Sequence, residues 1–348
     1  MNVRGAKKDV AAFWKGRKVL VTGASGLLGS QVTRLLIERT AEVTVLLRDW
    51  IPESPLITSG DLGRVRAVRG DLEDYFTVLR AVNEHEIDTI FHLGAQTIVG
   101  TASRSVISTF QSNIIGTMNV LEAARICSAL VKRVVVASSD KAYGAHPRLP
   151  YTEDVPLQGR FPYDASKACA ELLCQSYFHS FGVPVAVTRC GNLYGGGDLN
   201  WNRLIPGTIR SALEGERPII RSDGKFVRDY FYVEDAAAAN LVLAERLEEL
   251  GLGGEAFNFG TETPMTVLAV VERILARIGR KDLGPIVKNE ASLEIREQFL
   301  DCRKARSRLG WKPVFTFDRG LDRTIAWYRN LLAPGPRSEA LEQARGYA

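Results

Sequence analysis

The sequence predicts an α/β fold in which a doubly wound parallel sheet is followed by a smaller second domain. Short runs rich in Val and Ile alternate with longer amphipathic stretches along the first half of the chain, a pattern typical of strands buried on both faces and covered by helices. A glycine-rich turn follows the first run, and 348 residues correspond to about two domains. With 45% hydrophobic and 24% charged residues, the composition excludes a disordered or collagen-like chain.

Strands and helices are expected to take turns in the first part of the chain. The expected strands are Val19–Thr22, Val43–Leu47, Val65–Arg69, Thr89–Leu93, Arg133–Ser138 and Val185–Arg189. The expected helices are Ser30–Arg39, Phe76–Glu84, Ser112–Cys127 and Ala165–Phe181. Because strand and helix alternate, each connection is a crossover, and the strands should run parallel.

A second domain is expected after Gly191, where the sequence becomes rich in Gly and Asn. Helices are expected at Leu204–Leu213 and Thr266–Ile278, and Tyr230–Val233 and Ala256–Phe259 are candidate strands that return to the first domain. The expected boundaries are 15–190 with about 230–260 for the first domain, 191–229 with 261–332 for the second, and tails at 1–14 and 333–348.

Charge and cysteine content point to a cytoplasmic protein that binds neither nucleic acid nor a membrane. The net charge of +5 is spread without long basic runs, which is compatible with an anionic small-molecule substrate. Five sparse cysteines lack the paired spacings of zinc sites or disulfide scaffolds, and four scattered histidines give no basis for a metal site. No uncharged apolar run approaches the roughly 20 residues of a membrane span.

The strongest local motif is the glycine-rich turn after the first strand. Its residues, which we expect to bind a dinucleotide, are Gly23, Ser25, Gly26, Leu27, Leu28 and Gly29. Glycines spaced three apart let the backbone turn tightly and approach a pyrophosphate at the start of the following helix. The strand before and the helix after supply the context that a glycine triplet alone lacks, so we expect a Rossmann domain.

The adenosine end of this site is expected near the second and third strands. An acid usually ends the second strand and holds the ribose, but here Leu47 is followed by Arg48. Arg48 is compatible with three roles, which are binding a 2′-phosphate and thus favouring NADP, stacking on adenine, or facing solvent. Asp71 ends the third strand, either as an adenine contact or as an ordinary turn residue.

A second group of polar residues is expected to do acid–base chemistry. Tyr163 and Lys167 are four residues apart, so they share one face of a helix, where the ammonium can lower the pKa of the phenol. Ser139 follows the fifth strand and can relay or orient the proton. Asp140 and Lys141 follow it directly, either as acid and base or as a structural ion pair.

In this order, TGxxGxxG, Ser139 and YxxxK resemble an extended short-chain dehydrogenase/reductase that acts on nucleotide sugars, and the likeness spans roughly Trp14 to Leu332. Ser139-Asp140-Lys141 resembles the nucleotide-sugar 4,6-dehydratases, especially the CDP-glucose type. The resemblance implies that Tyr163, aided by Ser139 and Lys167, takes the C4 hydroxyl proton while hydride passes from C4 to the nicotinamide. Lys141 would then remove the C5 proton as Asp140 protonates the departing C6 hydroxyl, and hydride would return to C6.

The same resemblance implies the remaining site residues and a homodimer. Leu72, Leu93 and Ala95 would lie beside the cofactor, with NAD implied by the family and NADP left open by Arg48. Substrate contacts would come from Gln96, Ser139, Asn192, Arg228 and Arg296, the last in surroundings that match less closely. Helices Ser112–Cys127 and Ala165–Phe181 would pair with those of a second copy.

Two other functions use the same motifs. A nucleotide-sugar 4-epimerase would use Tyr163, Lys167 and the cofactor but needs no acid or base at Asp140 and Lys141. A non-catalytic cofactor sensor needs no base, so the presence of Ser139, Tyr163 and Lys167 argues against that function. The segment RDYFYVEDA resembles the sequence common to epimerases and deoxythymidine-diphosphate-type enzymes. The nucleobase and the hexose of the substrate therefore stay open. His92 is expected to be a hydrogen-bonded core residue and Asn113 to hold backbone geometry.

Overall fold

The computed structural model describes residues 10–290 and 295–333 and contains a seven-stranded parallel sheet at its centre. The strands lie in the order β11-β6-β5-β4-β1-β2-β3. Their bounds are β1 Lys18–Thr22, β2 Glu42–Leu47, β3 Arg66–Arg69, β4 Thr89–His92, β5 Arg133–Ala137, β6 Val185–Cys190 and β11 Ala256–Phe259. In register, Val21 of β1 lies between Val45 of β2 and Phe91 of β4, so apolar side chains meet across the central strands.

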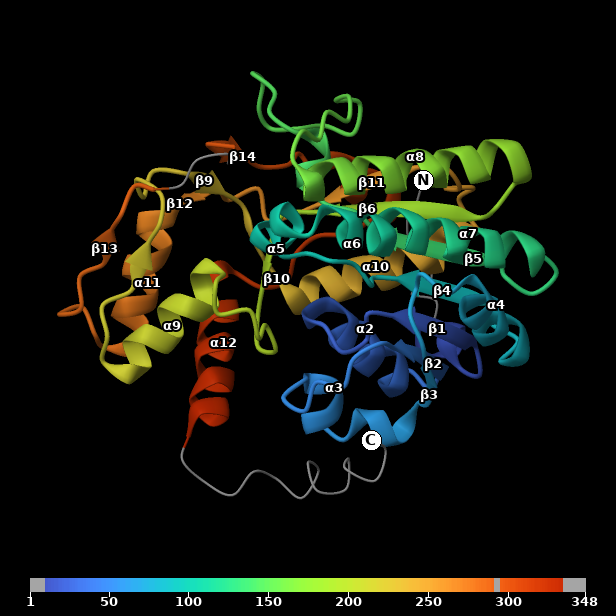
Figure 1. Cartoon of the computed structure of the whole chain (residues 1–348), viewed down its shortest axis with the longest axis horizontal. Coiled ribbons are helices and arrows are strands. Elements are labelled where there is room, and N and C mark those ends of the chain that lie inside the picture. The colour runs from blue at the N-terminus through green and yellow to red at the C-terminus, as the bar shows by residue number, and fades with distance from the viewer. Residues whose placement is uncertain (1–9, 291–294, 334–348) are drawn as a thin grey trace, which may run out of the picture.

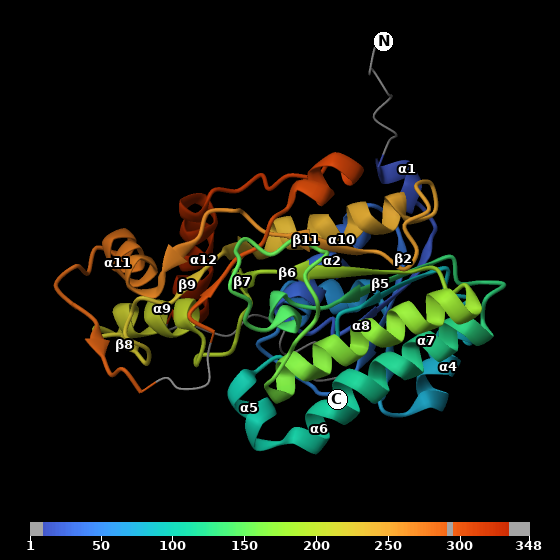
Figure 2. The same cartoon turned by 90° about the horizontal axis from the view of Figure 1, so that it is seen from above.

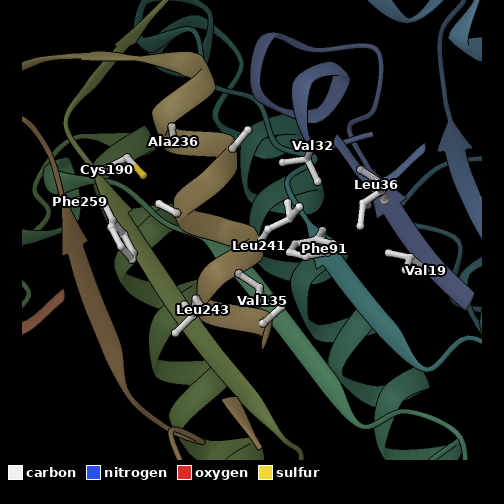
Figure 3. Packing of buried hydrophobic residues seen from close by; sticks show 14 of the residues in the cluster. Val19, Val32, Leu36, Phe91, Val135, Cys190, Ala236, Leu241, Leu243 and Phe259 are labelled. Atoms are coloured by element: carbon white, nitrogen blue, oxygen red, sulfur yellow. The ribbon is translucent and has the colours of Figure 1, made fainter. Parts of the chain in front are cut away.

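Helices cover both faces of this sheet, which confirms the doubly wound α/β fold. One face carries α2 Leu27–Glu38 and α10 Val233–Leu247, and the other carries α4 Tyr75–Glu84, α7 Gly116–Ile126 and α8 Pro162–Phe181 (Figures 1 and 2). On the first face, Leu241 and Leu243 of α10 and Leu36 of α2 pack over Phe91 and Val135 of the sheet (Figure 3). Such burial of apolar area is the main source of the fold's stability.

A smaller lobe, built from the later helices and short strands, lies beside the carboxyl ends of the sheet strands (Figure 1). Its helices are α9 Leu204–Glu214, α11 Val267–Ile278 and α12 Phe317–Leu332. The π-helical turn η4 Ala305–Leu309 instead packs on the large domain, against α10 and β11. The small sheets of the lobe pair β7 Asn192–Tyr194 with β10 Tyr230–Tyr232, β9 Val227–Arg228 with β12 Met265–Thr266 and β14 Glu297–Gln298, and β8 Ile219–Ile220 with β13 Ile286–Val287. The exact domain boundaries at 190, 230 and 260 stay a prediction.

Short elements complete the described chain. They are α1 Val10–Trp14, α3 Pro55–Thr58, η1 Asp61–Arg64, α5 Val99–Arg104, α6 Val106–Phe110, the π-turn η2 Gln111–Ile115 and the 3-10 turn η3 Asp140–Tyr143. The five cysteines are free thiols. Within the described ranges, no helix combines the length and apolar character needed to cross a membrane, and no cluster of His, Cys, Asp and Glu side chains is suited to a metal ion.

Two sequence expectations about these elements were wrong. Tyr230–Tyr232 does not join the large sheet but pairs with β7, because Tyr230 and Tyr232 pack into the apolar cluster of the smaller lobe. The expected tail 1–14 is helical from Val10, and the fully buried Trp14 donates its indole N–H to Glu245 at 2.6 Å. Of the expected tail 333–348, all but Ala333 lies outside the described residues. Ala256–Phe259 does return to the large sheet, beside β6.

Candidate active site

The glycine-rich turn lies where β1 ends and α2 begins. Gly23 has φ +69°, and a Cβ there would lie 2.7 Å from the Cα of Gly94. A Cβ on Gly29 would lie 2.1 Å from the Gly23 carbonyl oxygen, so only glycine allows α2 to pack against β1. The N-cap residue of α2 is the exposed Gly26, which provides no side-chain cap.

The first turn of α2 therefore keeps backbone N–H groups for an anion, as a dinucleotide pyrophosphate requires. The other expected contacts of this turn fit the same arrangement. Leu27 and Leu28 begin α2 and are half-buried, while the Ser25 carbonyl accepts a hydrogen bond from the Ser54 hydroxyl at 2.8 Å. The turn thus combines a positive helix terminus with a backbone that no side chain obstructs.

The end of β4 forms the next wall of the site. The Thr22 hydroxyl accepts hydrogen bonds from the backbone N–H groups of Leu93 at 3.1 Å and Gly94 at 3.0 Å. His92 is buried between the hydroxyls of Thr22 and Thr117, and burial lowers its pKa to about 3. The ring is therefore neutral at physiological pH, and His92 has the expected core role. Ala95, half-buried, continues this wall.

The expected adenosine contacts lie together after β2 and β3. Arg48 forms an ion pair with Asp49 at 2.7 Å and remains about half exposed. The hydrogen bond with Asp49 and the charges of Asp49, Asp71 and Glu73 raise the pKa of Arg48. Asp71 also accepts the backbone N–H of Glu73 at 3.2 Å, and the buried Leu72 lies next to it. Arg48 is thus surrounded by carboxylates.

Tyr163, Lys167 and Ser139 lie on α8 and at the start of η3. Tyr163 and Lys167 lie on the first turns of α8 and are buried, and Ser139 precedes η3. Burial raises the pKa of Tyr163 to about 12, although a hydrogen bond with Ser139 opposes this shift. The Lys167 ammonium donates to the Ala137 carbonyl at 2.7 Å, and burial lowers its pKa to about 8. The pKa of the phenol is thus raised by burial and not lowered as the sequence predicted.

Asp140 and Lys141 lie directly beside this group. Asp140 is buried, and desolvation raises the pKa of its carboxyl against the opposing charges of Lys141 and Arg228. Its Oδ1 accepts a hydrogen bond from the Ser139 hydroxyl at 3.0 Å. Lys141 Nζ donates to Gln298 Oε1 at 3.3 Å. A buried carboxyl with a raised pKa is suited to donate a proton.

Among the substrate contacts expected from the later part of the chain, Arg228 acts on the Asp140 carboxyl. It is buried, its guanidinium donates to the carbonyl oxygens of Val227 at 2.8 Å and of Arg296 at 3.1 Å, and its charge acts on Asp140. The exposed Arg296 side chain forms an ion pair with Asp223 at 2.9 Å. Both guanidinium groups flank the Phe226 ring, with Cζ at 5.7 Å and 5.8 Å from its centroid.

The two remaining substrate candidates follow the carboxyl ends of β4 and β6. Asn192 begins β7, and its backbone N–H donates to the Asp229 carbonyl at 3.0 Å. The Gln96 backbone is bound from both sides by the Asn113 amide, which accepts its N–H at 2.7 Å and donates to its carbonyl at 3.1 Å. The same Asn113 amide donates to Ser166 of α8 at 2.9 Å, so it holds two parts of the site together.

Sequence reasoning missed three residues that the structure brings to this site. The buried Asp164 follows Tyr163, and desolvation raises its pKa to about 6 while Lys141 opposes the shift. Arg203, whose charge acts on Tyr163, binds Asp198 at 3.0 Å. Gln298 approaches Asp140 and Lys141 from β14. Only Asp164 had a local signal, its place within YDASK; the other two come from distant segments with no motif.

The sequence matches the profile of the "NAD dependent epimerase/dehydratase family" over residues 19–260. The chain belongs to this NAD-dependent epimerase/dehydratase family. It is 30% identical to a CDP-glucose 4,6-dehydratase of Salmonella typhimurium, covering 91% of this chain and 92% of the relative. It is 32% identical to a dTDP-glucose 4,6-dehydratase of Neisseria meningitidis, covering 90% and 93%.

Solved structures of the epimerase/dehydratase family superpose on most of the chain. A dTDP-glucose 4,6-dehydratase of Streptomyces venezuelae with NAD bound matches with a TM-score of 0.82 and 28% identity over 90% of this chain and 97% of that one. A UDP-glucose 4-epimerase of Thermotoga maritima with UDP-glucose matches with a TM-score of 0.82 and 29% identity over 91% and 100%. The family and the fold class that the sequence indicated are therefore both confirmed.

Proposed function

We propose that this protein is a nucleotide-sugar 4,6-dehydratase that converts an NDP-hexose into an NDP-4-keto-6-deoxyhexose. The observation that carries the proposal is the buried Asp140 beside Lys141, next to Ser139 and Tyr163. Removal of water across C5 and C6 needs both an acid and a base, and these two side chains supply them. The 4,6-dehydratase relatives support the same assignment.

The first part of the reaction depends on Tyr163. Its phenol oxygen takes the proton of the C4 hydroxyl, Ser139 orients that hydroxyl, and the Lys167 ammonium stabilises the resulting charge. A bound nicotinamide would supply the hydride acceptor for C4 and the hydride donor for C6. Gly23, Gly26 and Gly29 would hold its dinucleotide at the start of α2.

The second part depends on Asp140 and Lys141. A 4-keto group acidifies the C5–H bond, so neutral Lys141 Nζ can take that proton, and the C6–O bond breaks as Asp140 protonates the leaving hydroxyl. Lys141 returns a proton to C5, and the hydride for C6 would come from the bound nicotinamide. Atoms balance, since the substrate loses one water and the cofactor ends oxidised. Burial raises the pKa of the Asp140 carboxyl, and this favours the protonated form that donates the proton.

A 4-epimerase is the alternative function. Family members of both kinds share this fold, and the same Tyr163 and Lys167 would serve either reaction. In an epimerase the sugar rotates after oxidation, and hydride returns to C4, which leaves Asp140 and Lys141 without a chemical task. Burying a carboxyl is costly, and the catalytic role supplies a reason for it that epimerisation does not.

NAD is the cofactor we propose, rather than NADP. A 2′-phosphate near Arg48 would also meet the carboxylates of Asp49, Asp71 and Glu73, whose charges already act on that guanidinium. Repulsion from these carboxylates disfavours the extra phosphate. We expect calorimetry to give at least about tenfold tighter binding of NAD. Equal or tighter binding of NADP would contradict the assignment.

The substrate diphosphate would be bound by Arg228, because a guanidinium can bind phosphate oxygens through two hydrogen bonds. Arg296, whose guanidinium contacts the same Phe226 ring, would add a second charge once it leaves Asp223. Asn192 and Gln96 would contribute neutral contacts. The overall charge of +5 agrees with a dianionic ligand.

A homodimer is part of the same proposal. Large apolar side chains are exposed on α6, on η2 and on the outer faces of α7 and α8, which lie side by side in Figure 2. They are Ile107, Ile115, Ile126, Leu172 and Phe181. A second copy of the chain would cover this apolar face symmetrically. In light scattering, Leu172→Arg should shift the dimer toward monomer, whereas Val314→Arg, on an equally apolar exposed side chain away from these helices, should not.

The reaction is tested by incubating the protein with CDP-, dTDP-, UDP- and GDP-glucose and NAD, and following the sugar nucleotides by mass spectrometry and NMR. We expect loss of one water from at least one of them, and no loss with Asp140→Asn or Lys141→Met. Unchanged mass with an inverted C4 centre would contradict dehydration and favour epimerisation. Arg228→Met serves as a binding control, since it should raise the KM more than it lowers kcat.

A further inference from the structure

The side chain of Gln298 connects the smaller lobe to the Asp140–Lys141 turn. Gln298 ends β14, is fully buried, and lies in none of the motifs. Its Nε2 donates to the backbone carbonyl of Asp140 at 2.6 Å, and its Oε1 accepts from Lys141 Nζ at 3.3 Å. One amide thus binds two consecutive residues of the turn, from a strand more than 150 positions later in the chain.

Hydrogen-bond chemistry fixes the orientation of this amide. The Asp140 carbonyl can only accept, so it must face the amide nitrogen. The amide oxygen therefore faces Lys141 Nζ and occupies one N–H of the amine. When the amine is neutral, its lone pair must point away from Gln298. The amide thus restricts the directions in which Lys141 can take a proton.

Strand pairing holds the backbone of Gln298, and the residue after it is also hydrogen-bonded. It pairs in register with Arg228 on β9, and Arg228 also pairs with Met265 on β12. Immediately after Gln298, the Phe299 carbonyl accepts the backbone N–H of Tyr151 at 3.0 Å. Gln298 therefore presents its amide from an ordered strand, as a precise site needs.

We propose that Gln298 is a positioning residue for the elimination step, holding Asp140 and directing Lys141 Nζ toward C5 of the sugar. This inference rests on the proposed dehydratase function and adds a residue to it. Gln298 has hydrogen bonds to Asp140 and Lys141, whereas the C4 oxidation uses Ser139 and Tyr163. Its loss should thus slow removal of water and leave oxidation at C4 intact.

The pairing of Gln298 with Arg228 also suggests how substrate binding is transmitted to the turn. Arg228 is the proposed diphosphate contact, and its guanidinium binds the carbonyl oxygens of Ile295 and Arg296 on the segment leading into β14. A diphosphate that engages Arg228 therefore acts on the same strand pair that carries the Gln298 amide. One small sheet would thus carry both the residue that binds the diphosphate, Arg228, and the residue that orients the groups acting on the sugar, Gln298.

The test variant is Gln298→Met, which keeps the length of the side chain and removes both hydrogen bonds. Glu297→Met is the matched control, because Glu297 is the exposed neighbour in the same strand and points to the opposite face. Gln298→Glu is the second variant. Its carboxylate would add a negative charge beside Lys141, on which Asp164 already acts, and would favour the charged amine, so the activity profile should shift to higher pH.

Three quantities are measured with the full-length protein and its sugar nucleotide. They are the rate of C4 oxidation from the near-ultraviolet absorbance of reduced nicotinamide in rapid mixing, the exchange of the C5 proton in D₂O by NMR, and the release of water. For Gln298→Met we expect C5 exchange and water loss to fall about 10- to 100-fold, with reduced nicotinamide accumulating and oxidation at C4 within about threefold of the wild type. Glu297→Met should behave as wild type.

The outcomes distinguish a failure of the positioning role of Gln298 from a failure of the proposed dehydratase function. A Gln298→Met protein with normal C5 exchange, or with oxidation and elimination reduced equally, would overturn the positioning role. An unshifted pH profile in Gln298→Glu would also count against it. If the wild type itself releases no water from any nucleotide hexose, the dehydratase function fails, and the inference fails with it.

Discussion

The buried ion pair between Glu171 and Arg189 provides a sharp test of how the catalytic helix is held. Glu171 lies one turn after Lys167 on α8, and Arg189 lies on β6. Their side chains are only 1% and 4% exposed, and Arg189 Nη2 and Nε bind Glu171 Oε2 at 2.6 Å and 2.9 Å. Arg189 also donates to the Tyr143 hydroxyl at 2.7 Å. This network links α8 to the sheet directly beneath the catalytic residues.

Removing one partner should leave an uncompensated buried charge. We expect Glu171→Met to lower the free energy of unfolding by about 3–5 kcal/mol. With an unfolding entropy near 0.7 kcal/mol/K for a chain of this length, the melting temperature should fall by about 5 °C. Arg189→Met should have a similar effect, while the double variant should lose much less than the sum, since no charge is left buried.

Urea unfolding of the four proteins measures the coupling energy between the two side chains. The matched control is Arg66→Met, which breaks the exposed Arg66–Glu42 pair at 3.1 Å and should cost at most about 1 kcal/mol. Strictly additive losses in the double variant would refute the reasoning, because they would mean that the two charges do not depend on each other.

Three further predictions concern single residues. Tyr163→Phe should lower kcat about 100- to 10,000-fold with unchanged calorimetric NAD affinity, and retention of more than a tenth of the activity would contradict its role as proton acceptor. His92 has a pKa lowered to about 3, so only the unfolded state takes up its proton below pH 6.5. Stability should thus fall by about 2 kcal/mol more in the wild type than in His92→Asn between pH 6.5 and about 5, and parallel urea curves would contradict this. Gly29→Ala should weaken NAD binding at least about tenfold, because its Cβ would lie 2.1 Å from the Gly23 carbonyl oxygen, whereas Gly63→Ala, with open space around it, should not.

The features that the sequence predicted correctly are those whose physical cause is local. Glycines three apart force a tight turn, and Tyr163 and Lys167 share a helix face because they are four residues apart. The alternation of apolar runs and amphipathic stretches likewise defined the parallel sheet. In each case the spacing along the chain determines the geometry, so no knowledge of distant contacts is needed.

The features that were missed depend on contacts between distant segments. Gln298 reaches Asp140 only because the short β14 pairs with β9. A strand of two residues is too short to show an apolar pattern from which that pairing could be predicted. Tyr230–Tyr232 is a strand, as its sequence indicates, but it pairs with β7 and not with the large sheet, because its tyrosines pack in the smaller lobe. The pKa of Tyr163 is raised rather than lowered because burial, which depends on the whole fold, outweighs the hydrogen bond with Ser139 and the charge of Arg203.

The path of a deuterium label from C4 tests the central proposal most directly. A nucleotide glucose carrying deuterium at C4 is incubated with the enzyme in ordinary water, and the product is examined by NMR and mass spectrometry. If Tyr163 serves the oxidation and Asp140 and Lys141 the elimination, the deuterium should appear at C6 of a product that has lost one water. Deuterium that remains at C4 of an intact sugar with inverted configuration would contradict the account and identify an epimerase.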